Sequence, residues 1–311
     1  MEDAETSLYF SIDFWYHIFR ENTVRTRFID VSTEFLDYML RDGVVLPHNP
    51  NMERDDPRVQ NTEIESDSEE SEKEEDEAEE EEEVYHFHEL EEQIQDTLDD
   101  FGGECFVRSN WSSTKDASWI LGSLKCSTPG HVLLLLKTSD RVCADFNRVS
   151  ALPSVSPVIA LQRWCNYFPS MEFCLYIADG SLKAVSQRDT SVFYPFLVKE
   201  KDAICSLLTA FVADRVKGRF PVVRFAMDVY IDKKEKVWVV NVEAYDDAMN
   251  TGLFSKEELD AIMDKEELVY RVVEEEGSTL PSEQLFYQLP LDMQKLSSDK
   301  EVAEFISNLK Q

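Results

Sequence analysis

The chain has 311 residues, of which 43% are hydrophobic and 11% aromatic, so it is long enough for two packed subdomains with apolar cores. Its formal net charge of −32 argues against a general binder of nucleic acid or of anionic membranes, because an acidic field of this size repels phosphate. The six cysteines form no CxxC pair, the chain opens without a basic secretory leader, and no apolar run is long enough to span a bilayer. We therefore expect buried free thiols in a cytoplasmic protein.

Apolar spacing and turn residues predict a mixed set of elements. In chain order these are helices at 14–20 and 35–40, a linker at 47–83, a helix at 87–101, strands at 105–108 and 131–137, a hairpin of 175–177 with 184–186, a helix at 204–212, a hairpin of 222–231 with 237–243, and a helix that begins at Ser255. Strands and helices do not alternate regularly, which favours an α+β fold over a doubly wound sheet.

The linker contains an acidic block. Between Glu63 and Glu83 there are fifteen acidic residues and one lysine, a composition that repels itself and stays disordered. Ser66 and Ser71 each have Glu at the third position after them, so acid-directed phosphorylation is one interpretation. A solvated entropic loop explains the same composition.

The second hairpin, 222–231 with 237–243, carries the most chemical information. With a turn at Lys233-Lys234 and Asp232 opposite Glu235, alternation puts one apolar set on a single face. In the second strand that set is Trp238, Val240 and Val242. The opposite face collects Arg224, Asp228, Tyr230, Asn241 and Glu243. Two carboxylates and an amide are the oxygen ligands that Mg²⁺ prefers, although a solvent-facing sheet surface is polar as well.

Other polar residues are candidates for a nucleotide site. Lys137 ends the predicted strand 131–137, where a buried lysine can reach a phosphate, and Arg188 can make bidentate phosphate contacts. The segment Arg163-Trp164-Cys165 offers backbone and aromatic surface for an adenine. Each has a structural alternative, namely a snorkelling lysine, an ion pair and a core tryptophan. The phosphate-binding motifs GxxxxGK[ST] and GxGxxG are absent from the sequence.

A series of short motifs, in order and with compatible spacing, resembles the cell division cycle protein 123 family, which has an ATP-grasp-type fold. The matching segments include 15–20, 38–43, 110–112, 116–120, 137–140, 163–165, 172–173, 186–189, 227–230, 253–254, 257–259 and 287–290. They cover nearly the whole chain. The resemblance implies an ATP-grasp-like α+β fold with a nucleotide site between two lobes. It divides the chain into 1–46 (helical part of the first lobe), 47–83 (disordered acidic linker), 84–155 (rest of the first lobe) and 156–311 (second lobe and C-terminal tail).

The resemblance also implies a function and a set of site residues. Family members look like ATP- and Mg²⁺-dependent assembly chaperones that bind the gamma subunit of eukaryotic translation initiation factor 2. Matched by position, the cofactor-binding residues are Arg108, Trp111, Ser113, Lys115, Lys137, Gln162, Arg163, Trp164, Cys165, Glu172 and Arg188, and the metal ligands are Asp228, Asn241 and Glu243. The resemblance implies an ATP-binding chaperone rather than a turnover enzyme. We expect a monomer, and the acidic net charge argues against binding of nucleic acid or membrane.

Several positions depart from the family pattern. Arg108 stands where the family has Lys, and Lys115 where it has Arg, so donor geometry changes at both. Cys174 replaces an arginine, and the metal pair reads Asn241-x-Glu243 instead of Asp-x-Asn. These changes keep two further hypotheses open: an ATP-grasp ligase or phosphotransferase, and a pseudo-ATP-grasp scaffold that no longer binds nucleotide.

Overall fold

The computed structural model of the chain describes residues 4–41, 43, 85–152, 154–247 and 249–280. The predicted linker, with Ser66 and Ser71, and residues 281–311 lie outside the described residues. In chain order the elements are α1 (Ala4–Phe10), α2 (Ile12–Phe19), η1 (Arg20–Asn22), β1 (Thr26–Asp30), α3 (Thr33–Leu40), α5 (His88–Phe101), β2 (Cys105–Arg108), η2 (Lys115–Ala117), α6 (Ser118–Leu121), α7 (Pro129–Thr138), α8 (Asp140–Ser150), β3 (Val158–Arg163), η3 (Pro169–Met171), β4 (Glu172–Ala178), β5 (Ser181–Gln187), α9 (Pro195–Lys199), α10 (Lys201–Phe211), η4 (Val212–Val216), β6 (Arg224–Ile231), β7 (Val237–Ala244), α11 (Lys256–Met263), β8 (Val269–Arg271) and η5 (Glu276–Ser278).

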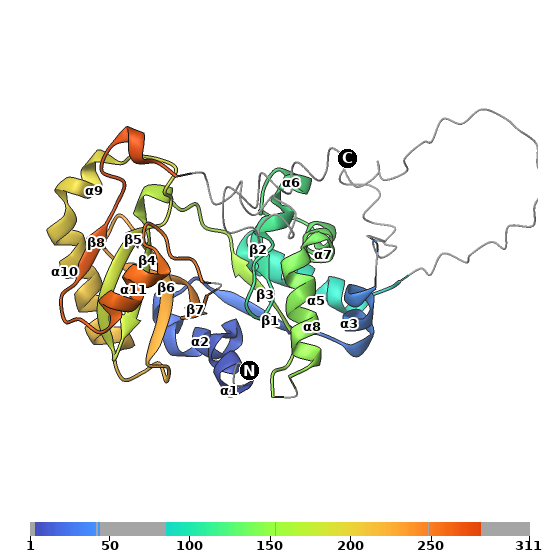
Figure 1. Cartoon of the computed structure of the whole chain (residues 1–311). Coiled ribbons are helices and arrows are strands. Elements are labelled where there is room, and N and C mark those ends of the chain that lie inside the picture. Colours follow the sequence, from blue (N-terminus) through green and yellow to red (C-terminus); the bar gives the residue numbers. More distant parts are fainter. Residues whose placement is uncertain (1–3, 42, 44–84, 153, 248, 281–311) are drawn as a thin grey trace, which may run out of the picture.

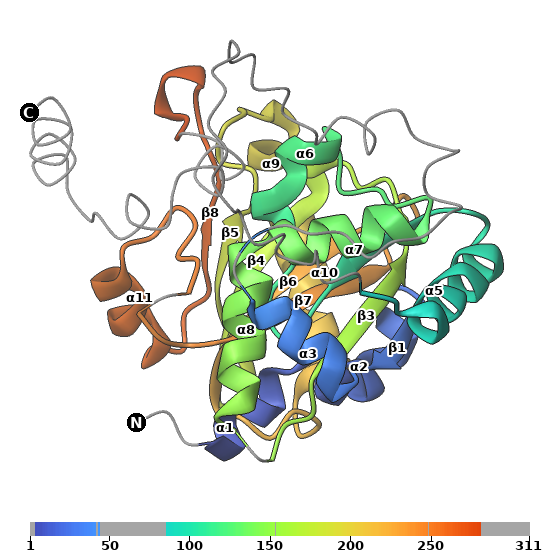
Figure 2. The ribbon, with the colours of Figure 1, turned by 90° about the vertical axis from the view of Figure 1, so that its right-hand side faces the viewer.

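Two sheets form the framework of the molecule (Figure 1). The smaller has strand order β1-β3-β2 and is antiparallel throughout. The larger has order β7-β6-β4-β5-β8 and is antiparallel except for the parallel β5–β8 pair. Seen from the side of the smaller sheet, α3, α5, α7 and α8 lie toward the viewer (Figure 2). The expected α+β fold, with its ATP-grasp-like division into two lobes, is confirmed.

The alternation of β3 explains how the two lobes meet. Ile159 and Leu161 point into the core of the smaller lobe, whereas Val158 and Ala160 belong to the core of the larger sheet. Helix α2 contacts both β3 and β7 and packs in that second core. Arg108 of β2 is paired with Ala160, so the Arg108 side chain also points toward the larger sheet.

The expected lobe boundaries stay a prediction. The expected boundary puts residues after 155 in the second lobe. Strand β3 begins at Val158, after this boundary, and yet it belongs to the smaller sheet. The apolar side chains of α2, within 1–46, pack with the larger sheet.

Local signals in the sequence predicted several elements that the structure contains. Helix α5 ends at the expected glycines, and Gly102 has a φ of 87°. Strands β4 and β5 are joined through Asp179 and Gly180, both with positive φ, as a tight hairpin turn requires. The capping box of Ser255 and Glu258 begins α11. Helices α2, α3 and α10 overlap their predicted ranges, and β2 matches its predicted strand.

The strand predicted at 131–137 is wrong, because these residues lie in helix α7. The Thr128 hydroxyl caps this helix by accepting a hydrogen bond from the His131 amide at 3.2 Å, and Pro129 occupies the first turn. All side chains from Val132 to Leu136 are buried in the smaller lobe. The run therefore lacks the polar face that marks a helix in a sequence.

The cysteines agree in part with the expectation of buried free thiols. All six cysteines are free, and Cys105, Cys126 and Cys174 are buried as expected, but Cys165 is exposed. Within the described ranges, no helix has both the length and the apolar composition that crossing a membrane requires.

Candidate functional site

The predicted register of the β6–β7 hairpin is wrong. Asp232 does not stand opposite Glu235, because its backbone amide donates to the carbonyl of Lys236 at 3.0 Å and closes a longer loop. Tyr230 therefore pairs with Trp238. The buried apolar residues of β7 are Val237, Val239 and Val242, instead of the predicted Trp238, Val240 and Val242.

A β-bulge restores the polar face of this hairpin. The register shifts by one residue at Asp228, which pairs with Asn241 and leaves Val240 as the extra residue of β7. Glu243 lies two residues beyond Asn241, so the two side chains project to the same side. Asp228, Asn241 and Glu243 consequently share one face. Without the extra residue Val240, the odd-numbered residues of β7 would point to the opposite face from Asp228.

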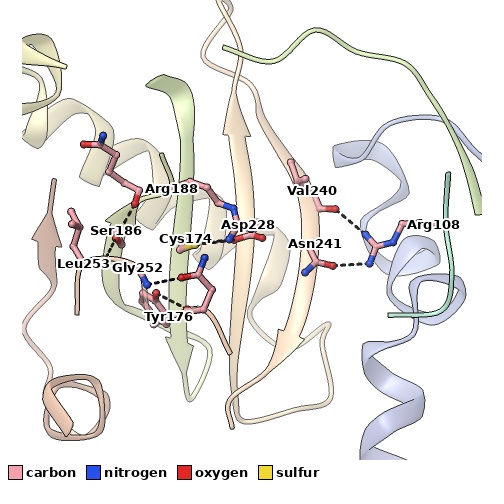
Figure 3. Close-up of polar contacts among 12 residues, drawn as sticks. Arg108, Cys174, Tyr176, Ser186, Arg188, Asp228, Val240, Asn241, Gly252 and Leu253 are labelled. Carbon is pink, nitrogen blue, oxygen red and sulfur yellow. Dashed lines mark hydrogen bonds and ion pairs between the residues drawn. The ribbon is translucent and has the colours of Figure 1, made fainter. Parts of the chain in front are cut away.

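Asp228 forms a buried ion pair with Arg188 on this face (Figure 3). Arg188 Nη1 lies 2.8 Å from Asp228 Oδ1, and the two side chains are only 10% and 7% exposed. Cys174 Sγ lies 2.9 Å from the same oxygen and 3.2 Å from the guanidinium. Burial, together with the charge of Asp228, raises the pKa of the Cys174 thiol, so the thiol stays protonated and donates to Asp228. Arg188 thus supplies a cation beside the position where the sequence lacks one.

Arg108 connects the two lobes (Figure 3). Its Nη2 donates to Asn241 Oδ1 at 2.9 Å and to the Trp111 carbonyl at 2.8 Å, and its Nη1 lies 3.5 Å from the carbonyl of the bulge residue Val240. Burial lowers the pKa of Arg108 to about 10, against the opposing effect of nearby carboxylates, first of all Asp145. Among the described residues, Arg108 Nε has no hydrogen-bond partner. A buried guanidinium with a spare donor is suited to an anionic ligand.

A pocket of about 550 Å³ lies where the end of β3 meets β6 and β7. Its walls are Tyr16, Arg20, Glu21, Thr23, Val24, Arg25, Arg163, Cys165, Asn166, Tyr167, Tyr230 and Trp238. The rings of Tyr167 and Tyr230 pack with centroids 4.5 Å apart. Size and aromatic lining are those of a small-molecule site.

The segment 162–165, predicted to contact the adenine, lines this pocket only in part. Arg163 and Cys165 line it. The side chain of Gln162 is buried and lies 3.3 Å from the Thr26 hydroxyl, and the indole of Trp164 donates to Asn166 Oδ1. Neither Gln162 nor Trp164 is among the lining residues.

Trp111 and Ser113 lie in the segment that follows β2. The Trp111 indole donates to the Ser7 carbonyl at 2.9 Å, and the guanidinium of Arg148 stacks over its ring at 4.5 Å. Ser113 forms an isolated backbone bridge with Arg108. The structure therefore brings Ser113 beside Arg108, while the ring of Trp111 packs against the N-terminal helix α1.

The two remaining predicted residues, Glu172 and Lys115, lie in separate elements. Glu172 is paired with Tyr230 in the ladder of β4 and β6, next to the 550 Å³ pocket. Lys115 begins the short turn η2 beyond Ser113.

Lys137 contacts backbone carbonyls. Its Nζ lies 2.7 Å from the Tyr38 carbonyl, 3.4 Å from that of Met39 and 2.6 Å from that of Arg41. These carbonyls are at the C-terminus of α3, where a cation is favourable. These contacts support the structural alternative for Lys137 and follow from its position on α7, and the phosphate contact stays a prediction.

Sequence reasoning missed Asp145, a buried carboxylate of α8 that accepts hydrogen bonds from the segment after β2. A signal was present: Val142, Asp145, Phe146 and Val149 follow helical spacing, and all four are buried. An acidic residue inside an apolar stripe marks a buried carboxylate with a specific partner.

Two lobes, each built on one sheet, with charged side chains from both meeting between them, define a two-lobed α+β protein. A sequence model of the D123 family matches residues 15–297, and the chain belongs to this family. The expected kinship with cell division cycle protein 123 is thereby confirmed.

Known proteins similar to this chain agree with that assignment. A Xenopus laevis protein named translation initiation factor eIF2 assembly protein is 28% identical over 95% of this chain and 93% of its own length. An Aspergillus terreus protein named cell division cycle protein 123 is 30% identical over 80% of this chain and 61% of its own. The solved structure of Cdc123 from Schizosaccharomyces pombe is 25% identical, covers 86% of this chain and 96% of its own, and has a TM-score of 0.68.

Proposed function

We propose that this protein is an ATP- and Mg²⁺-binding assembly chaperone for eukaryotic translation initiation factor 2, acting in the cytoplasm as a monomer that binds the gamma subunit. Membership of the D123 family supports the assembly function, as does the name of the Xenopus laevis relative. The observation that carries the nucleotide part is the meeting of Arg108, from the smaller sheet, with the Asp228–Asn241 face of the larger sheet.

The adenine and the phosphates of ATP would bind to two different parts of the structure. The 550 Å³ pocket, with Tyr167, Tyr230 and Trp238 in its walls, accommodates the adenine. Arg108 and Arg188 are the cations for the phosphates, because guanidinium groups bind phosphate oxygens with paired, charge-assisted hydrogen bonds.

Asp228, Asn241 and Glu243 would hold the Mg²⁺, which would neutralise phosphate charge when bound. They fit this part as oxygen donors on one face of neighbouring strands. Asp228 Oδ1 and Asn241 Oδ1 accept here from Arg188 and Arg108, so both guanidinium groups must turn away to admit the ion. No cluster of three or more His, Cys, Asp or Glu side chains suited to a metal occurs in the described part of the chain. Phosphate oxygens and water would therefore complete the coordination.

ATP would act by joining the lobes. A ligand held by Arg108 on one sheet and Arg188 on the other restricts their relative motion, which preorganises the surface that binds the partner. This requires no chemistry on the partner. The net charge of −32 steers the chain toward a basic face of the gamma subunit.

Calorimetric titration tests the nucleotide part. We expect ATP to bind in the presence of Mg²⁺ and to bind at least tenfold more weakly in EDTA. Glu243→Gln should reduce the Mg²⁺-dependent gain, whereas Asp264→Asn, which alters an exposed ion pair with Arg224, should leave it unchanged. No heat at millimolar ATP, with a folded protein, would refute nucleotide binding.

A pulldown tests the assembly part independently. With the full chain as bait, the isolated gamma subunit should be retained, and more of it with ATP and Mg²⁺ than without. A folded bait that fails to retain the gamma subunit under both conditions would refute the proposed partner, whatever the calorimetry shows.

One observation favours a second function, the scaffold without nucleotide. Asp228 Oδ1 and Asn241 Oδ1 already accept hydrogen bonds from guanidinium groups, so these two oxygens have partners without a metal ion. Absence of any thermal shift with ATP, combined with retention of the gamma subunit, would establish the scaffold. The enzyme hypothesis, a ligase or phosphotransferase, requires ADP release that rises with an added acceptor and disappears in Asp228→Asn.

A further inference from the structure

The segment that follows β2 is held by one buried carboxylate from outside the site. Asp145 of α8 is 7% exposed. Its Oδ2 accepts from the Ser109 hydroxyl at 2.5 Å, from the Trp111 amide at 3.1 Å and from the Ser112 amide at 2.7 Å. Its Oδ1 accepts from the Ser112 hydroxyl at 3.1 Å. Four donors from one short segment thus converge on a single side chain.

The backbone of residues 109–112 forms a compact turn around this carboxylate. The Ser109 amide donates to the Ser112 carbonyl at 3.0 Å, which closes the turn. Two of the amides inside it, those of Trp111 and Ser112, point at Asp145. Successive amides directed at one point form an anion-binding concavity, and Asp145 is the anion that this turn contains. Without it, both of these half-buried amides would lose this acceptor.

The same turn places two residues of the candidate site. Arg108 precedes it and donates to the Trp111 carbonyl at 2.8 Å, so the guanidinium that reaches Asn241 rests on the turn. Ser113 follows it and is bridged to Arg108. The carboxylate of Asp145 is also the first of the negative charges that stabilise the buried Arg108 cation.

We infer that Asp145 is a positioning residue for nucleotide binding: it fixes the turn 109–112 in the conformation that presents Arg108 and Ser113 to the phosphates, without touching the nucleotide. This inference rests on the proposed ATP binding. Its rival is a purely structural part, in which Asp145 stabilises the smaller lobe and has no effect on affinity beyond that.

The decisive variant is Asp145→Asn, which keeps the size of the side chain but removes its negative charge and leaves a single acceptor oxygen for the four donors. The matched control is Val149→Ala, one turn along the same helix and also buried, which removes apolar volume but no hydrogen bond to the turn. Ser109→Ala is a milder variant, since it removes one of the four donors and leaves both backbone amides in place.

Hydrogen exchange without nucleotide gives the first readout. In Asp145→Asn the amides of Trp111 and Ser112 should exchange at least tenfold faster, and in Val149→Ala they should change no more than the rest of α8. The second readout is ATP affinity by calorimetry. We expect a loss of at least tenfold for Asp145→Asn, two- to fivefold for Ser109→Ala and less than twofold for Val149→Ala.

The two readouts separate the possible failures. Continued protection of the Trp111 and Ser112 amides in Asp145→Asn would overturn the inference, and so would unchanged ATP affinity in a variant whose turn exchanges fast. An equal loss of affinity in Val149→Ala would establish the purely structural rival. If the unaltered chain binds no ATP, the proposed function fails first and the inference fails with it. If Asp145→Asn does not fold, the graded effect of Ser109→Ala on both readouts decides.

Discussion

The buried Arg188–Asp228 pair makes a quantitative prediction about stability. Asp228→Asn keeps the shape and an acceptor oxygen but removes the negative charge from a pair whose side chains are 10% and 7% exposed. A hydrogen bond to a charged group is worth about 1.5–3 kcal/mol, and breaking a buried pair costs about 3–5 kcal/mol. Since the acceptor oxygen remains, we expect a loss of about 2–3 kcal/mol.

Urea unfolding measures this loss. With a denaturant dependence of about 3 kcal/mol per molar urea, as expected for a large chain, the midpoint should fall by about 1 M. Asp264→Asn is the control. Asp264 forms an ion pair with Arg224, which lies on β6 like Asp228, but the Asp264 and Arg224 side chains are 71% and 44% exposed. An exposed pair contributes about 0–1 kcal/mol, so this midpoint should hardly move.

A double variant checks the physical reason. Asp228→Asn combined with Arg188→Met leaves no buried charge without a partner, so the double variant should recover part of the stability lost in Asp228→Asn alone. If Asp228→Asn lowers the midpoint no more than Asp264→Asn does, the pair is not desolvated in the folded protein. A buried, charged Arg188–Asp228 pair at this site would then be refuted.

Three further predictions follow from single contacts. Lys137→Met should lower the free energy of unfolding, measured in urea, by about 2 kcal/mol, because three carbonyls at the C-terminal end of α3 lose their donor. Its ATP affinity should stay the same. Unchanged stability with weaker ATP binding would support a phosphate contact instead. Gly252→Ala should destabilise by at least about 1 kcal/mol more than Gly122→Ala in the same assay. Both glycines have positive φ, but an added Cβ would lie 2.3 Å from Ser186 Oγ at Gly252 and meet nothing within 4 Å at Gly122; equal losses would contradict this. Cys165 should be alkylated ahead of the buried cysteines. Its rate should still rise above pH 9.0, because partial desolvation of the thiol in the pocket wall raises its pKa. ATP should slow the reaction, and labelling unaffected by ATP would place the nucleotide outside the pocket.

The local elements of this fold follow from short stretches of sequence. The glycines after α5, the Asp179-Gly180 turn and the capping box of Ser255 with Glu258 each act within a few residues, so their backbone preferences are legible without any partner. Composition and element order likewise determined the α+β class. Alternation along β6 predicted that Asp228 faces away from the apolar core.

The geometry of the candidate site depended on contacts between distant residues. Asn241 shares the face of Asp228 only because Val240 forms a bulge, and Arg108 meets Asn241 across 133 positions of sequence. Helix α7 is buried on all sides, so its sequence shows no helical periodicity. Its packing also places Lys137 beside the carbonyls at the end of α3. Periodicity records which side chains are buried within one element. It carries no information about which element lies opposite, and only tertiary packing decides that.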